Sequence, residues 1–299
     1  NYTPELTGIV TLSTDMMMVV NRGAEEISIF NRIDGHLLAR LDKLASKPWS
    51  ICHLRGHSNT FAVTLDNGHI QILSIVKTEQ SIAITRVRTL DLTRHFTRCT
   101  GVKTLSKGDF ILVSGFIGGL ICWGIVSVTT GDVNEMHTIC EGHEWSYVAT
   151  SPNNAIAYIS CLAGLNSPCN GVYAFDISTG SRRFVYRDSE LMFPSGICVD
   201  NSGFIFVCSY DSSIHQLSES GEKMRVHKDK TLYGLKGIYW EEPSGYLYVS
   251  QYNNNMVRRL PPVFSHVNEQ GNAAIFFISL EVNICLTKVN SLTDFRKCP

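Results

Sequence analysis

A short run in the middle of the chain carries side chains that ligate metals. Cys140-Glu141-Gly142-His143 is followed by Cys161 and Cys169. A structural zinc site needs paired short spacings, such as two C-x2-C or C-x2-H arms. Only one arm of this kind occurs here, and the other two cysteines flank an LNSP turn. The sequence therefore predicts no metal site and no cofactor, and we interpret these residues as core and loop side chains.

A hydrolase would need a different set of residues. The sequence has no G-x-S-x-G nucleophile elbow, and its cysteines are isolated on strand-like segments, where thiols are usually inert. Calcium prefers carboxylate and amide oxygens. Six such side chains lie at predicted turns: Asp200, Asn201, Asn153, Asn154, Glu241 and Glu242. Because Asn and Asp favour turns for conformational reasons, we interpret them as turn residues. A calcium-dependent lactonase or esterase is the second alternative function.

Basic residues gather in three stretches, and Lys and Arg are the side chains that contact RNA phosphates. The RNA-contact candidates are Arg86, Arg88, Arg94, Arg98, Lys103, Arg182 and Arg183, and a third stretch runs from Lys223 to Lys230. Phe96, Phe193 and Tyr233 lie near these stretches and could stack on bases. RNA binding is therefore the first alternative function. The whole chain gives it no support, because its net charge is −1 and its pI is near 6.8.

The composition is that of a folded domain with a large core. Hydrophobic residues make up 44% of the 299 residues and charged residues only 18%. No apolar run approaches the ~20 residues of a membrane-spanning helix, so we expect no membrane association. The ten cysteines are scattered singly, which favours a reducing compartment and a cytoplasmic location.

These residues must be positioned by a repeated four-strand unit. The clearest copy begins at Gly196 and reads GICVDNSGFIFVCSYDSSIHQLSESGEKMRVH. Period-2 apolar runs separated by Gly, Asn and Ser predict antiparallel hairpins. First strands begin at Gly8, Ser50, Gly101, Tyr147, Gly196 and Gly237. The spacing of roughly 40–50 residues is the period of β-propeller blades.

The sequence therefore predicts an all-β fold, a six-bladed β-propeller with four-stranded antiparallel blades and almost no helix. A glycine in a first strand allows close backbone approach near the central channel. We assign residues 1–262 to the propeller and 263–299 to an irregular C-terminal segment that acts as a closing strand or a tail. The strand that closes the ring is expected from Tyr2–Leu6 or from AIFFISLEV near the C-terminus.

The blade that starts at Gly196 resembles an NHL repeat, in its Gly-Ile-x-Val-Asp start, its apolar strand into Asp and its later Gly turn. MVVNRGAEEISIFNRIDGHLLARL and KPWSICHLRGHSNTFAVTLDNGHIQILSI resemble the first and second blades of the same family. The resemblance covers about residues 8 to 260. Over this range the chain is similar to the NHL propeller of tripartite-motif (RING, B-box, coiled-coil) proteins of invertebrate type.

The resemblance implies a non-catalytic propeller that recruits a protein partner or ubiquitination substrate. No RING or B-box spacing is present, so any ubiquitin-ligase activity is expected in a region upstream of Asn1. We expect the partner on the face where first strands and interblade loops begin, because Trp, Tyr and Arg dominate binding hot spots. The candidates are Trp49, Arg55, Trp145, Phe193, Tyr233, Tyr252 and Arg258. Trp49, Trp145 and Phe193 could equally wedge adjacent blades together.

Overall fold

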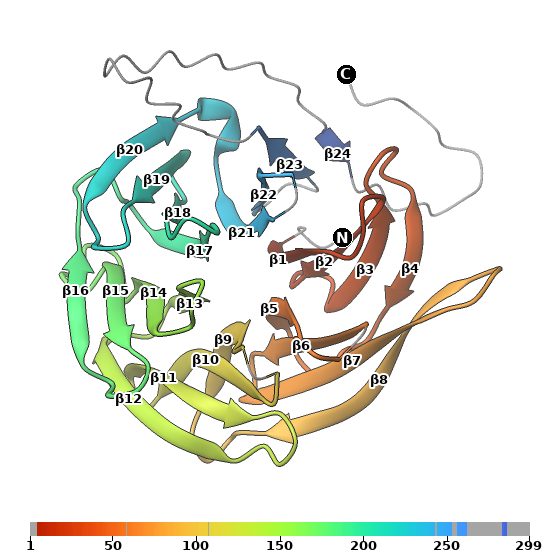
Figure 1. The fold of residues 1–299 in the computed structure, drawn as a ribbon, viewed down its shortest axis with the longest axis horizontal. Helices are drawn as coiled ribbons and strands as arrows, with labels where there is room; N and C mark the ends of the chain where they lie inside the picture. The colour runs from red at the N-terminus through yellow and green to blue at the C-terminus, as the bar shows by residue number, and fades with distance from the viewer. Residues whose placement is uncertain are drawn as a thin grey trace.

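The strands form six four-stranded antiparallel sheets arranged as a ring (Figure 1), and the inner strands line a central channel. This computed structural model describes residues 5–57, 59–106, 108–242, 244–252, 256–261 and 283–285. The prediction of an all-β, six-bladed β-propeller is confirmed. Within the described residues the one helical element is the 3₁₀ turn Lys230–Leu232, and no helix is long and apolar enough to cross a membrane.

Each blade takes its strands in chain order from the channel outward. Blade 1 contains β1 (Leu6–Thr11), β2 (Met16–Asn21), β3 (Glu26–Asn31) and β4 (Leu37–Leu41). Blade 2 contains β5 (Pro48–His53), β6 (Thr60–Leu65), β7 (His69–Lys77) and β8 (Ile82–Asp91). Blade 3 contains β9 (Arg98–Thr104), β10 (Phe110–Ile117), β11 (Leu120–Ser127) and β12 (Val133–Glu141).

The second half of the ring repeats this order. Blade 4 contains β13 (Trp145–Thr150), β14 (Ile156–Leu162), β15 (Gly171–Asp176) and β16 (Arg182–Tyr186). Blade 5 contains β17 (Pro194–Val199), β18 (Ile205–Ser209), β19 (Ser213–Leu217) and β20 (Lys223–Lys228). Blade 6 contains β21 (Leu235–Glu241), β22 (Tyr246–Gln251), β23 (Met256–Leu260) and β24 (Asn283–Cys285).

The inner strands approach one another so closely that side chains are excluded at some positions. A Cβ on Gly196 would lie 2.3 Å from the carbonyl oxygen of Lys236, and one on Gly237 would lie 2.9 Å from that of Thr7. Real Cβ atoms do not make contacts shorter than 3.0 Å. The expectation that glycine permits crowding around the channel is therefore confirmed at these positions.

The hydrophobic core is divided into layers between adjacent blades. One layer joins blades 2 and 3 and contains Phe96, Ile72 and Val113, and another joins blades 3 and 4 and contains Trp123. Burying a large apolar side chain contributes about 1.5–3 kcal/mol. These layers therefore hold neighbouring blades in a fixed orientation. The loops at the ends of the blades are anchored to this rigid core.

The ring closes where blade 6 meets blade 1. Ser250 donates a hydrogen bond to the carbonyl of Leu6 (3.0 Å), and Glu5 forms an antiparallel bridge with Tyr252. Leu6 belongs to the innermost strand of blade 1 itself, whereas β24 is the outermost strand of blade 6. Of the two segments proposed to close the ring, residues 2–4 and AIFFISLEV lie outside the described residues.

Candidate functional site

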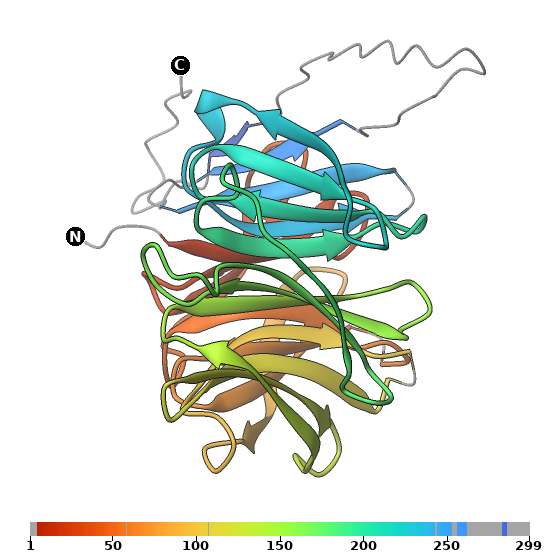
Figure 2. The same ribbon diagram turned by 90° about the vertical axis from the view of Figure 1, so that its left-hand side faces the viewer.

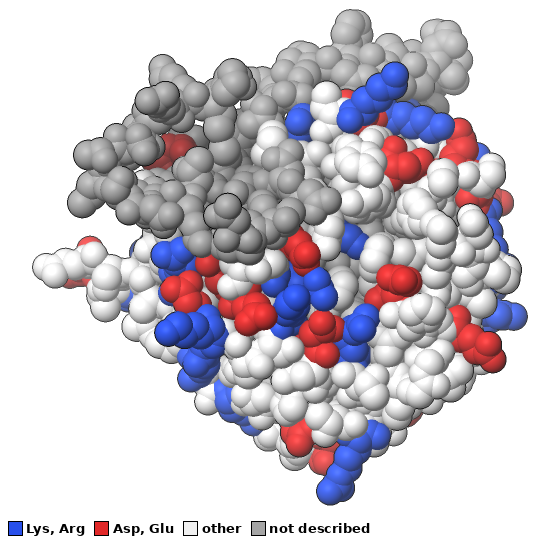
Figure 3. Space-filling view, turned by 180° about the vertical axis from the view of Figure 1, so that it is seen from behind, with Lys and Arg blue, Asp and Glu red and all other residues white. Residues whose placement is uncertain are grey.

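The two ends of the channel carry different sets of residues. Every inner strand begins on one face, here called the entry face, and ends on the opposite, exit face. The inner strands begin at Leu6, Pro48, Arg98, Trp145, Pro194 and Leu235. In Figure 2 the N-terminus lies on the entry side, and Figure 3 views this face directly. Basic and acidic side chains are interspersed on it around the channel.

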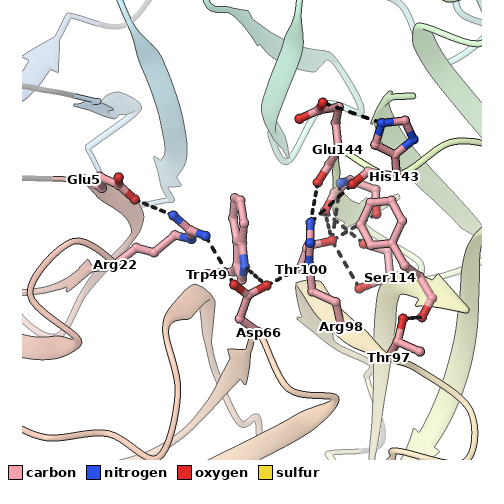
Figure 4. A network of polar contacts seen from close by, with 12 residues as sticks. Glu5, Arg22, Trp49, Asp66, Thr97, Arg98, Thr100, Ser114, His143 and Glu144 are labelled. Atoms are coloured by element: carbon pink, nitrogen blue, oxygen red, sulfur yellow. Dashed lines mark hydrogen bonds and ion pairs between the residues drawn. The ribbon is translucent and has the colours of Figure 1, made fainter. Parts of the chain in front are cut away.

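A chain of ion pairs crosses the entry face between blades 1, 2 and 3 (Figure 4). Arg22 binds Glu5 (Nη1–Oε2 2.5 Å) and Asp66 (Nη2–Oδ2 3.2 Å). Asp66 also binds Arg98 (Oδ1–Nε 2.7 Å) and accepts a hydrogen bond from the Trp49 indole (3.1 Å). Burial opposes the charge of Arg22, but its hydrogen bond to Glu5 and the nearby carboxylates raise the Arg22 pKa. The network is therefore electrostatically compensated within itself.

Trp49 is a structural part of this network. Its side chain is only 5% exposed, and the Arg22 guanidinium lies 4.4 Å from its ring centroid. Trp49 therefore wedges the blades together and does not present a free surface. Its expected role as an exposed binding residue is wrong, because Arg22 covers it.

An aromatic cluster lies on the same face over blades 5 and 6. It consists of Phe193, Tyr210, Tyr233 and Tyr252. The Tyr210 ring lies at its centre, with centroid distances of 6.5 Å to Phe193, 5.3 Å to Tyr233 and 6.2 Å to Tyr252. Three of the four were predicted from sequence, and Tyr210 was missed because it looked like part of an ordinary Tyr-Asp-Ser-Ser turn.

Backbone hydrogen bonds join the loops that carry this cluster. Tyr210 N–H donates to the carbonyl of Phe193 (3.3 Å), Gly234 to that of Tyr210 (2.9 Å), and Tyr252 to that of Gly234 (2.6 Å). Arg258 donates to Gln251 (3.2 Å) and to Thr231 (3.1 Å). Arg258 therefore braces the loop before Tyr233 and acts as a positioning residue.

A buried lysine lies beneath the aromatic cluster. The Nζ of Lys236 is 2.9 Å from the ring centroid of Trp145, 5.3 Å from that of Tyr252 and 5.6 Å from that of Tyr210. Lys236 is only 2% exposed. Burial, reinforced by the positive charge of Arg22, lowers its pKa well below the usual value. The sequence feature that could have identified this residue is a lysine between Leu235 and Gly237 in a predicted inner strand whose neighbouring residues are apolar.

Trp145 and Arg55, two further predicted binding residues, lie at opposite ends of the channel. Trp145 is half-buried on the entry face, and its indole donates to the carbonyl of Pro194 (2.9 Å). Arg55 follows the end of β5 and therefore lies on the exit face, next to the channel. Its placement among the entry-face residues is wrong, because a strand of six residues separates it from the beginning of β5.

The proposed RNA-contact residues are dispersed over the molecule. Arg86 and Arg88 on β8 donate to backbone carbonyls of neighbouring blades, and Arg98 belongs to the ion-pair network. Lys103 lies inside the channel, Arg94 is in the loop after β8, and Arg182 and Arg183 are on β16. Phe96 is fully buried. These described residues do not form one continuous basic surface.

The oxygen-bearing residues considered for calcium have local structural roles. Asp200 accepts hydrogen bonds from the backbone N–H of Ser202 (2.9 Å) and of Phe204 (2.9 Å), which closes the turn after β17. Asn153, Asn154 and Asn201 also lie in turns. Glu241 forms a bidentate ion pair with Arg32 (2.5 and 2.9 Å). In the described part of the chain no group of three or more His, Cys, Asp or Glu side chains is placed to hold a metal ion.

Two of the cysteines from the CEGH region come together between blades 3 and 4. The Sγ atoms of Cys140 and Cys161 are 3.5 Å apart. The hydrogen bond from Cys161 lowers the Cys140 pKa to about 7, although burial opposes this shift. Cys169 is close enough to contribute in the same direction. His143 is largely exposed and its ring faces Glu144 at 4.0 Å.

Comparison with solved structures supports the fold. The crystal structure of selenomethionine-substituted virginiamycin B lyase from Staphylococcus aureus matches with a TM-score of 0.59 and 15% sequence identity. The match covers 92% of this chain and 85% of the lyase chain. At this identity the similarity concerns the propeller fold alone. No family model matches the sequence, and no curated protein matches it.

Proposed function

We propose that this propeller is a non-catalytic protein-interaction module whose partner docks on the entry face over the aromatic cluster. The observation that carries the proposal is the exposure of large side chains at this place. Tyr233 is 60% exposed and Met192, next to Phe193, is 48% exposed. Both project from loops that a rigid scaffold holds, and such loops commonly carry recognition residues.

The chemistry of the cluster suits a protein partner. Tyr side chains combine a large apolar area with a hydroxyl group and are enriched in binding hot spots. The compensated ion-pair network of Glu5, Arg22, Asp66 and Arg98 lies beside the cluster on the same face. An apolar centre next to a polar margin is the usual organisation of a protein interface.

The backbone at Phe193 supports a specific role for its loop. Phe193 has a φ of +55°, in the left-handed region that bulky residues rarely adopt. Residues in such conformations concentrate at functional sites, where the surrounding structure holds them in place. Here the hydrogen bond that Tyr210 N–H donates to the Phe193 carbonyl helps to maintain the conformation.

The resemblance of the sequence to NHL repeats supports one class of partner. We infer that the partner is a substrate that this propeller presents to a tripartite-motif-type ubiquitin ligase. The RING chemistry would come from outside this sequence, which contains no RING spacing.

Site-specific photocrosslinking tests the docking surface. A photoreactive phenylalanine analogue at position 233 should yield a discrete crosslinked species in an extract of cells that produce the protein. The matched control is position 87 on the outer strand β8, where Val87 is also exposed (56%). Identical crosslinks from positions 233 and 87 would contradict the proposal.

Substitution of the same residue tests the energetics and the ligase link. Tyr233→Ala should weaken binding of the crosslinked partner about 10- to 30-fold, as expected for a hot spot. Its melting temperature should stay close to wild type because the side chain is exposed. In cells, ubiquitin conjugation of the partner should fall with Tyr233→Ala. If ubiquitin conjugation of the partner is unchanged although binding is weakened, the link to a ubiquitin ligase is rejected, whereas the proposed docking surface is still supported.

A further inference from the structure

The channel holds a cavity of about 720 Å³, which reaches the turns of the exit face. Inner strands of all six blades contribute to its wall, and the turns after β1, β5 and β21 form its rim. Ligand pockets for small molecules commonly have volumes of ~300–1,000 Å³. The cavity is therefore large enough for a small organic molecule, and it is separate from the proposed docking surface on the entry face.

The charged side chains that line this cavity are mostly positive. They are Arg32, Arg55, Lys103, Arg259, Glu241 and Glu242. The Arg32–Glu241 ion pair is nearly buried and internally compensated, with 8% and 11% of the side chains exposed. Arg259 lies over the Tyr246 ring at 4.5 Å, and its Nε is buried without a hydrogen-bond partner. Among the described residues that line the cavity, Lys103, Arg55 and Arg259 therefore outnumber Glu242, the carboxylate that is outside this ion pair.

Lys103 is the basic residue of this set that stands on an inner strand of the ring, β9. No described residue forms a hydrogen bond or an ion pair with its ammonium group. Burial lowers its pKa, and the nearby positive charge of Arg55 acts in the same direction. Lys103 is partly buried, and partial removal of an ammonium group from water has a free-energy cost when no anion is paired with it. An anion in the cavity would relieve this cost directly.

The rest of the wall is suited to an apolar body. Val102, Val148, Ile197 and Val199 line the cavity from blades 3, 4 and 5. Thr11 and Thr104 add hydroxyl groups near the exit end. The wall therefore combines apolar side chains with polar and basic groups, so that it can contact both an apolar body and an acidic group of one molecule.

We propose that this cavity binds a small organic anion, whose carboxylate or phosphate group is held by Lys103 and Arg55 and whose apolar part packs against the inner strands of blades 3 to 5. The Arg55 guanidinium can bind such an oxyanion in bidentate fashion, and Lys103 supplies a point charge.

Isothermal titration calorimetry with simple probes tests the proposal. Phenyl phosphate and benzoate represent the two anion types, benzyl alcohol is the uncharged control, and inorganic phosphate lacks the apolar body. We expect at least one organic anion to bind, and both benzyl alcohol and inorganic phosphate to bind much more weakly. The preferred probe identifies the acidic group. Absence of binding by both organic anions, or equal binding of inorganic phosphate, would overturn the proposal.

Substitutions locate the site. Lys103→Met should weaken binding of the preferred probe about 10- to 100-fold, since a hydrogen bond to a charged group is lost, and Lys103→Arg should retain most of it. Lys77→Met is the matched control, because Lys77 is an exposed lysine at the exit end of β7, outside the cavity wall. Melting temperatures would verify that each variant folds. Equal binding by wild type and Lys103→Met would overturn the proposal. The proposal would also be overturned if an acidic peptide bound in a Lys103-dependent way while small anions did not bind. In that case the ligand of the cavity would be an acidic side chain of a protein.

Discussion

The two mouths of the channel each contain a lysine that forms no ion pair with a carboxylate among the described residues, but the surroundings of the two lysines differ. At the entry mouth, aromatic rings enclose Lys236, and the neighbouring charges pair with one another. At the exit mouth, Lys103 lines an open cavity together with Arg55 and Arg259. A lysine is therefore buried under aromatic rings at the entry mouth, whereas a lysine lines a cavity at the exit mouth. This difference is the basis on which we propose surface recognition for the entry mouth and ligand binding for the exit mouth.

The largest expected effect concerns the ion-pair network of the entry mouth. Asp66→Ala leaves Arg22 and Arg98 without their shared carboxylate and the Trp49 indole without its acceptor. Because these groups are only partly exposed, we expect a loss of about 2–3 kcal/mol in the free energy of unfolding, measured with urea. Asp42→Ala is the control, since the Asp42 side chain is 56% exposed and its loss should cost little. Equal effects of the two substitutions would show that the network does not stabilise this mouth.

A smaller effect of opposite sign is expected at the two lysines. Lys236→Met replaces an enclosed ammonium group by an apolar side chain of similar length and should stabilise the protein by about 1–2 kcal/mol. Lys103→Met should stabilise it less, because Lys103 faces a cavity that water can enter. The comparison between the two mouths fails if Lys103→Met is the more stabilising substitution in urea unfolding.

The pH dependence of stability gives the finest test. The Lys236 pKa is lowered by burial in the folded protein, so the unfolded chain binds more protons in the range between that lowered value and about 10.5. The contribution of Lys236 to stability should therefore become less unfavourable as pH rises through this range. The groups facing Lys236 are Arg22, Glu5, Glu144, Tyr210 and Tyr252, and burial raises the Tyr252 pKa to about 12.

The measurement is the difference in unfolding free energy between wild type and Lys236→Met at pH 7, 8, 9 and 10. Because the surrounding groups are shared, their contributions largely cancel in this difference. The advantage of Lys236→Met should shrink as pH increases. An advantage that is independent of pH over this range would mean that the enclosed lysine does not titrate there.

The repeat pattern predicted the fold well, because its signals are local. Alternating apolar residues define strands, and Gly, Asn and Asp at turns define hairpins, so the six first strands could be found without knowledge of long-range contacts. Each of them begins two or three residues before its predicted start, at Leu6, Pro48, Arg98, Trp145, Pro194 and Leu235. The glycines of the inner strands were informative for the same reason, since Gly196 and Gly237 stand where any side chain would collide with a neighbouring backbone.

The candidate sites were predicted less well. Phe193, Tyr233 and Tyr252 do lie together, but residue type cannot show that Arg22 covers Trp49 or that Tyr210 joins the aromatic cluster. The basic stretches were grouped by sequence distance, although β8, the channel wall and β16 separate their members in space.

By itself, the sequence determined that the chain forms an antiparallel all-β ring, because strand periodicity and turn chemistry are properties of neighbouring residues. Only the tertiary structure decided which side chains share a face. Each inner strand carries its two ends to opposite sides of the ring, so Trp49 and Arg55, six positions apart, belong to different mouths of the channel. The closing of the ring likewise decides which groups surround a charged side chain. Arg22 forms an ion pair with Asp66 of the next blade, whereas Lys103 lines the cavity.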